Sequence, residues 1–145
     1  VGYMLAAMLG KRNFIDSLGV CSFTVNTYME LVCRALNALT GWDYTKEEAM
    51  IFGKRCSAIF RLFNLRCGIG VDLEKPSERY WSTPVDGPAA GTSAKENWET
   101  MVATYYKTAG WDRETGKPLP ETMRVLGLEQ FIPEVWGAEE ARVGG

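Results

Sequence analysis

The spacing of hydrophobic residues along the chain predicts amphipathic helices and no strand of useful length. From residue 24 to residue 39, apolar side chains recur every three or four positions, and Gly41 is suited to end that helix. The next helix is expected to start at Thr45, because Thr45 and Glu48 fit the S/T-x-x-E capping box. Apolar residues on two sides predict a central position for this helix. They are Phe52, Cys56, Ile59, Phe60 and Phe63 on one side, and Ile51, Ala58, Leu62 and Leu65 on the other.

The helical pattern is weaker in two other segments, one before and one after these helices. Residues 1–10 are expected to form a short helix that Gly10 ends, and residues 11–23 to form a structured loop. The segment 68–92 is rich in proline and glycine, which predicts a long loop.

Helical signals return after the loop. Ser93 and Glu96 fit a second capping box, and an apolar face then runs to Ala109, where Gly110 is expected to end the helix. The sequence RETGKPLP predicts a turn or a small hairpin, and Pro120 suits the first turn of a short helix that continues to about Leu126. The apolar face of the helix that Gly110 is expected to end consists of Trp98, Met101, Val102, Tyr105 and Ala109.

These elements predict an all-α, multihelical fold with a long Pro/Gly loop. The length of 145 residues and the hydrophobic fraction of 46% fit one domain with a packed core, or a part of a larger protein. We expect this domain to span 1–137, followed by a polar, frayed tail over 138–145.

Charge and cysteine content indicate which classes of partner and which cellular compartment to expect. With 16 basic and 18 acidic residues and no basic stripe, nucleic acid is not an expected partner. No apolar run reaches the length of a membrane span, and no signal peptide is recognisable, so no membrane partner is expected. Four cysteines are too few and too widely spaced for a disulfide scaffold, which indicates a reducing, cytoplasmic location. Cys33 and Cys56 lie on apolar helix patterns and are expected in or near the core.

The stretch DSLGVC, residues 16–21, combines three groups with distinct chemistry. The Asp16 carboxylate can accept two hydrogen bonds from an amidine-like edge, and Gly19 permits a backbone shape or a close approach that a Cβ would forbid. Cys21 as a thiolate is a soft ligand suited to iron. The residues alone allow a cofactor site but do not require one, since a buried cysteine and a capping aspartate also explain them.

Three motifs together resemble those of the tungsten-containing aldehyde ferredoxin oxidoreductase family. DSLGVC resembles that family's D-x-x-G-L-C motif, and RLFNLRCG at 61–68 is similar to its R-x-F-N-x-R-x-G segment. YYKTAGWDRETGKPLPETMRVLGL at 105–128 is similar to its Y-Y-x-x-x-G-W-D ending. The motifs occur in family order over roughly residues 14–128.

The resemblance implies a cofactor-binding role for the first motif. The family oxidises aldehydes to carboxylic acids with ferredoxin as electron acceptor, using tungsten or molybdenum held by two pterins beside one [4Fe–4S] cluster. Asp16 would bind a pterin, Gly19 would belong to the cofactor-binding turn, Val20 would contribute a backbone contact, and Cys21 would be the fourth cluster ligand. Val20 stands where the family usually has Leu. No residue of this chain is expected to be catalytic, and Arg61, Asn64 and Arg66 either line a site or pin the long loop.

The resemblance also implies that much of the enzyme lies upstream. The other three cluster cysteines, a second pterin-binding motif and the proton-handling residues belong there, and this chain contains no histidine. The chain resembles the last quarter of a full-length enzyme and, alone, is expected to be inactive and to hold no cofactor. Two alternatives remain: a family member that reduces acids or aromatic acyl thioesters, and a helical interaction domain without a redox role.

Overall fold

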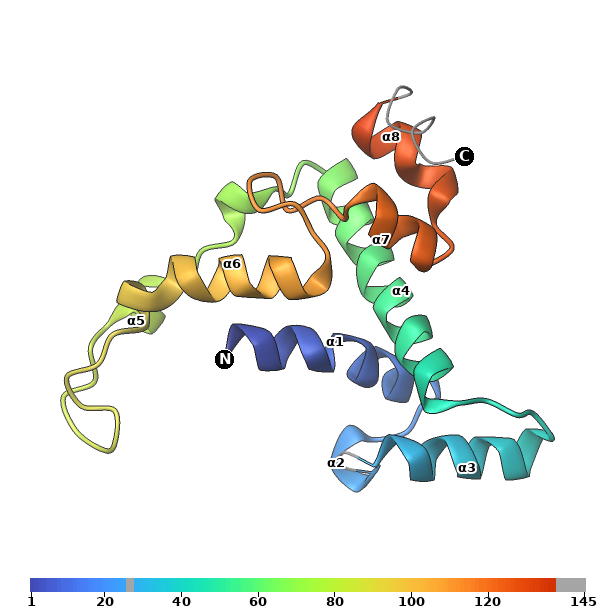
Figure 1. Ribbon diagram of the computed structural model, residues 1–145. Coiled ribbons are helices and arrows are strands. Elements are labelled where there is room, and N and C mark those ends of the chain that lie inside the picture. The colour runs from blue at the N-terminus through green and yellow to red at the C-terminus, as the bar shows by residue number, and fades with distance from the viewer. Residues whose placement is uncertain (26–27, 138–145) are drawn as a thin grey trace.

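A computed structural model describes residues 1–25 and 28–137 and confirms the all-α fold (Figure 1). The only extended pairing among these residues is one isolated antiparallel bridge between Trp111 and Pro118. The predicted tail, 138–145, lies outside the described residues. The main helices are α1 (Gly2–Ser17), α2 (Ser22–Val25), α3 (Met29–Thr40), α4 (Lys46–Arg66), α5 (Glu78–Trp81), α6 (Trp98–Ala109), α7 (Pro120–Val125) and α8 (Ile132–Trp136). Short 3₁₀ turns cover Val71–Leu73, Ala94–Asn97 and Glu129–Phe131.

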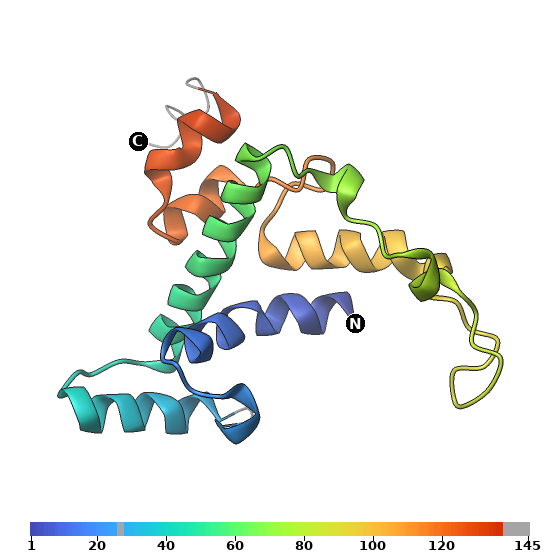
Figure 2. The same cartoon turned by 180° about the vertical axis from the view of Figure 1, so that it is seen from behind.

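Helix α4 is the central element. In both ribbon views, α1 crosses the first half of α4 and lies beside α6, whereas α7 and α8 pack near the end of α4 (Figures 1 and 2). One apolar cluster joins α1, α3 and α4, and a second joins α4 to the C-terminal helices. The first consists of Phe14, Ile15, Met29, Val32, Cys33 and Ala49, and the second of Ala58, Met123, Leu126, Leu128 and Ile132.

Several predicted helix ends are confirmed. Thr45 and Glu48 form a reciprocal capping box at the start of α4. Gly41 and Gly110 end α3 and α6 in the left-handed conformation. Pro120 occupies the first turn of α7. All of these signals act within a few residues of one another, which is why they can be read from sequence.

The predicted end of the first helix at Gly10 is wrong, as is most of the predicted loop over 11–23. Helix α1 continues through Gly10 to Ser17, and this glycine lies at the crossing with α4, opposite Gly53. A Cβ placed on Gly53 would lie 1.6 Å from the carbonyl oxygen of Gly10. The missing side chain allows two backbones to touch, and it does not end the helix.

Other expectations are corrected in detail. The helix predicted from residue 24 begins at Met29, after the separate turn α2. On α4 the buried line consists of small residues and Arg61, whereas Phe60 and Phe63 are exposed. Cys56 is therefore half-buried, and Cys33 is the core cysteine. The second capping box does not form, because the Ser93 hydroxyl accepts from the N–H of Lys95 and donates to the carbonyl of Trp81.

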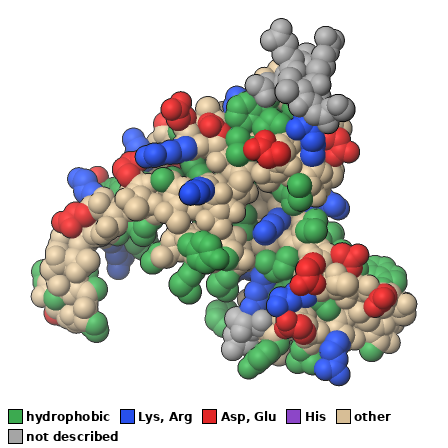
Figure 3. Space-filling view, viewed as in Figure 1, with side chains coloured by type: hydrophobic (Ala, Val, Ile, Leu, Met, Phe, Trp, Pro, Cys, Tyr) green, Lys and Arg blue, Asp and Glu red, His purple; other side chains and the backbone are tan. Residues whose placement is uncertain are grey.

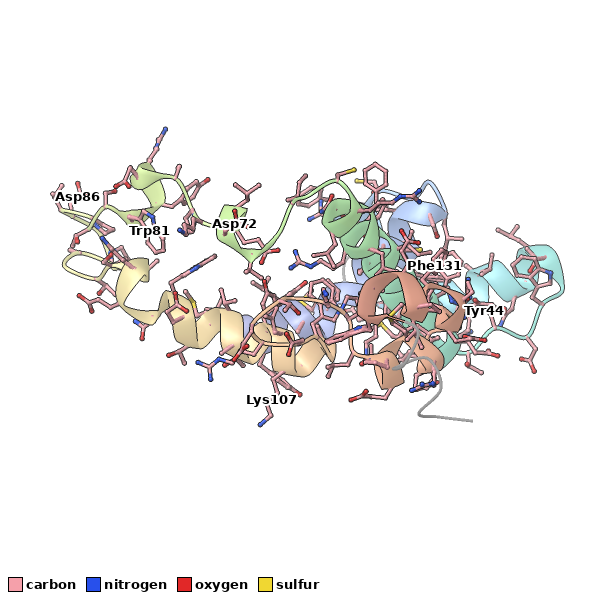
Figure 4. The ribbon with its side chains drawn as sticks, turned by 90° about the horizontal axis from the view of Figure 1, so that it is seen from above. Tyr44, Asp72, Trp81, Asp86, Lys107 and Phe131 are labelled. Carbon is pink, nitrogen blue, oxygen red and sulfur yellow. The ribbon has the colours of Figure 1, made fainter. Side chains whose placement is uncertain are left out.

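The long loop leaves the helical body as an arm that carries α5. Figure 4 shows Trp81 and Asp86 on this arm, at the opposite end of the molecule from Tyr44. The rings of Trp81 and Trp98 meet edge to face at the base of the arm, with centroids 5.6 Å apart. No helix in the described residues is long and apolar enough to cross a membrane.

Candidate functional site

The DSLGVC stretch lies on the surface where α1 ends and the chain turns into α2. The backbone N–H of Gly19 donates to the carbonyl of Asp16, which closes the turn. Gly19 has a φ of +68°, and a Cβ there would meet no atom within 4 Å. A glycine is therefore needed here for the left-handed backbone, and not for a close approach by another part of this chain.

Asp16 occupies the last turn of α1 with its carboxylate accessible. Its side chain is 52% exposed, and the nearest cation is Arg12, whose Nε lies 3.6 Å from Oδ2. An exposed pair of this kind, one helical turn apart, contributes only a few tenths of a kcal/mol to about 1 kcal/mol. The carboxylate therefore remains free to accept hydrogen bonds from another group.

Cys21 presents a free, exposed thiol just before α2. Hydrogen bonds from the backbone N–H groups of Phe23 and Thr24 lower the pKa of this thiol, and the nearby Asp16 carboxylate opposes them. The net effect is a lowered pKa, so the thiolate, which is the form that binds metals, forms more readily than in an ordinary exposed thiol. The preceding residue, Val20, is also exposed.

These groups fit one edge of an iron–sulfur and pterin site. Among the described residues no group of three or more His, Cys, Asp or Glu side chains could hold a metal ion. Cys21 can supply one thiolate of the usual four, and Asp16 can supply two acceptor oxygens to an amidine-like edge. A complete centre thus requires ligands from outside the described residues.

A separate cleft of about 700 Å³ lies between α1, α4, α6 and the start of the arm. Its walls are largely apolar, and Asn64 is among the residues that line it. Asn13, which also lines it, donates to the carbonyl of Gly53 and to the hydroxyl of Ser57. The principal wall residues are Leu5, Leu9, Phe60, Trp98, Met101, Val102 and Tyr105.

Arg61 joins the second and third sequence motifs at the end of this cleft. Its guanidinium is buried, donates from Nε to the carbonyl of Gly116 at 2.8 Å and forms an ion pair with Glu74. It also lies over the ring of Trp111, 5.3 Å from the centroid. Because Glu74 belongs to the long loop, the structure shows Arg61 pinning that loop. Arg66, in contrast, is exposed and 3.7 Å from Glu134.

Tyr106 contacts the ion pair of Arg61 and Glu74, and the sequence did not predict this contact. Its hydroxyl donates to Glu74. Burial, followed by the hydrogen bond and charge of Glu74, raises the pKa of Tyr106 well above its ordinary value. The Y-Y-x-x-x-G-W-D motif that contains Tyr106 was the available signal, but sequence spacing could not show which residue it meets.

Comparison with known proteins decides the family. Residues 2–128 match the family model described as "Aldehyde ferredoxin oxidoreductase, domains 2 & 3". The chain belongs to the aldehyde ferredoxin oxidoreductase family. It is 35% identical, over 88% of its length, to the tungsten-containing aldehyde ferredoxin oxidoreductase of Pyrococcus furiosus, and 31% identical, over 89%, to that of Thermococcus kodakarensis.

The comparisons also limit how much of such a protein this chain represents. It covers 21% of each of those two relatives. A further relative, 30% identical over 84% of the chain, is the WOR-like subunit of an aliphatic sulfonate oxidoreductase from P. furiosus, of which the chain covers 20%. No solved structure matches. The chain thus spans about a fifth of the length of these family members.

Proposed function

We propose that this chain is the C-terminal helical domain, residues 1–137, of a cytoplasmic oxidoreductase that oxidises aldehydes to carboxylic acids. The observation that carries the proposal is the pairing of Asp16 and Cys21 on one accessible turn, in a chain that belongs to the family. Each side chain can reach a different group, because the left-handed Gly19 reverses the chain between them.

In this proposal the chain supplies one edge of the cofactor site. The Cys21 thiolate is the fourth ligand of a [4Fe–4S] cluster, the Asp16 carboxylate accepts hydrogen bonds from a pterin, and Val20 offers its backbone. A bound tungsten or molybdenum bis-pterin centre would supply the chemistry of a two-electron oxidation, and a bound cluster would supply single-electron transfer toward ferredoxin. The remaining ligands come from upstream domains of the same polypeptide, so the isolated chain is inactive.

The substrate has a second candidate. The relative named as an aliphatic sulfonate oxidoreductase subunit is 30% identical to this chain, close to the 31% of the T. kodakarensis enzyme. Identity over this region therefore supports the cofactor site more strongly than it supports an aldehyde. A full-length enzyme acting on another substrate would use Asp16 and Cys21 in the same way.

The test uses the full-length enzyme and measures bound iron and tungsten. Cys21→Ala is expected to deplete iron, because alanine offers no replacement thiolate. Asp16→Asn is expected to weaken tungsten and pterin retention and leave most iron in place, since the amide keeps the shape but loses the charge and one acceptor. Cys67→Ala, at another exposed free cysteine, is the matched control. A Cys21→Ala enzyme with full iron and normal ferredoxin-linked turnover would refute the proposal.

A further inference from the structure

Two hydrogen-bonded side chains, Asn13 and Ser57, join α1 to α4 beside the point where the backbones of these helices touch. Asn13 also donates from Nδ2 to the carbonyl of Gly53 on α4, at 3.3 Å. The Ser57 hydroxyl lies 3.2 Å from that carbonyl oxygen and 3.4 Å from the carbonyl oxygen of Leu9 on α1. Asn13 therefore donates to α4, and Ser57 can donate back to α1. We call this pair the α1–α4 clamp.

The clamp is the polar connection of α1 to the rest of the domain. Among residues 1–25 and 28–137, no other side chain forms a hydrogen bond between α1 and another helix or loop. Apolar contacts specify the placement of α1 less sharply, because its apolar residues are not confined to one face. Figure 3 shows apolar side chains at the surface near α1. The exposed large apolar residues of α1 are Tyr3, Met4, Leu5 and Met8.

The clamp fixes how far α1 is shifted along α4. The contact of Gly10 with Gly53 selects the faces that meet, and Asn13 follows Gly10 by about one helical turn. An N–H···O bond prefers a length of about 2.9–3.0 Å and weakens steeply below an angle of about 120°. A shifted α1 would therefore break these bonds and leave the buried Ser57 hydroxyl poorly paired. A polar residue in an apolar helix interface is a well-attested way to fix register.

The register of α1 decides where Asp16 lies. Asp16 follows Asn13 by three residues on the same continuous helix, so any shift of α1 moves its carboxylate. Cys21 lies beyond the end of α1, in a segment that is also held from beneath. Leu18 and Val25, on either side of Cys21 in sequence, pack against the first apolar cluster. A displaced α1 therefore moves the Asp16 carboxylate more than the Cys21 sulfur.

We propose that Asn13 is a positioning residue for the cofactor site. Together with Ser57 it fixes the register of α1 and so holds the Asp16 carboxylate where a pterin can reach it. The inference rests on the proposed function, in which Asp16 accepts hydrogen bonds from a pterin. Neither member of the clamp needs to contact the cofactor in this role. Removing a residue that orients a ligating group typically lowers metal affinity or activity by about 10–100-fold.

The experiment uses the full-length holoenzyme and measures the rate of tungsten release, the iron per chain and the urea midpoint. Asn13→Leu should release tungsten at least about tenfold faster than wild type and keep its iron. Asn37→Leu is the matched control, because Asn37 is also half-buried and exchanges two hydrogen bonds with the backbone of Tyr44, away from α1. It should lower the urea midpoint about as much as Asn13→Leu does, but release tungsten at the wild-type rate.

A double variant separates register from stability. Asn13→Leu combined with Ser57→Ala removes both members of the clamp, so neither leaves the other unpaired in the interface. The urea midpoint should therefore recover at least in part, whereas tungsten release should stay about tenfold faster than wild type. If Asn13→Leu alone does not fold, the double variant carries the same test.

Three results would overturn the inference. The first is wild-type tungsten release from Asn13→Leu, or from the double variant. The second is equally fast release from Asn37→Leu, which would indicate a general loss of stability. The third is loss of iron in proportion to tungsten. Asp16→Asn separates this inference from the proposed function: if it loses tungsten while Asn13→Leu retains it, only the positioning role fails, whereas retention in both variants removes the pterin assignment of Asp16.

Discussion

Replacing Gly53 by alanine tests the crossing of α1 and α4. In an exposed helix interior, Gly→Ala stabilises by about 1 kcal/mol because glycine is the poorer helix former. Here the new Cβ would lie 1.6 Å from the Gly10 carbonyl oxygen, 1.4 Å short of the 3.0 Å that real Cβ contacts keep. The obstacle is backbone, so it can yield only if the two helices separate.

The expected result is therefore a loss of stability where propensity alone predicts a gain. Overpacking in a tight core costs about 1–3 kcal/mol and occasionally more, and a backbone collision belongs at the upper end. After the propensity gain, a net loss of about 2 kcal/mol remains. With a urea dependence of about 1.5 kcal/mol per molar, the unfolding midpoint of the purified chain should fall by about 1 M or more.

Lys54→Ala is the control, since it places alanine at the next, exposed position of α4. It should change the midpoint little. An unchanged or higher midpoint for Gly53→Ala would show that α1 and α4 do not touch through their backbones, and the packing described for α1 would be wrong.

Two further predictions concern a cap and a turn. Hydrogen bonds at the start of α4, first from the backbone and then from the side chain of the N-cap residue, lower the pKa of Glu48 below its ordinary 4.5. The stability that Glu48 adds is thus present above pH 4.5 and lost as the pH falls through the lowered pKa. Urea midpoints of wild type and Glu48→Gln should differ at pH 7, and the difference should shrink as the pH falls below 4.5, so a difference that acid leaves unchanged would contradict this. Gly116→Ala should cost about 3 kcal/mol or more in the same assay, because left-handed strain adds to the displacement of the buried Arg61 guanidinium. A Cβ at position 116 would lie 2.0 Å from Nη2 of Arg61. Gly19→Ala, which shares the positive φ but meets no atom within 4 Å, should cost only the strain of about 1–2 kcal/mol, and equal losses would argue against the Arg61 contact.

The sequence by itself determined the fold class and the local signals at helix ends. The capping box at Thr45 and the stop at Gly41 depend on hydrogen bonds within a few residues, so their patterns are sufficient. The motif residues Asp16 and Cys21 were likewise found from sequence, through resemblance. Their accessibility was not, because exposure depends on which surfaces meet in the folded chain.

The tertiary structure alone decided what distant segments do to one another. Gly10 has the same local pattern as a helix-stopping glycine, and its role in a close backbone approach appears only when Gly53, 43 positions later, is placed opposite it. Arg61 could line a site or pin a loop, and the choice depended on Glu74 and on the carbonyl of Gly116. A close backbone approach and a buried ion pair are properties of pairs of positions, and the pattern around either member alone does not contain its partner.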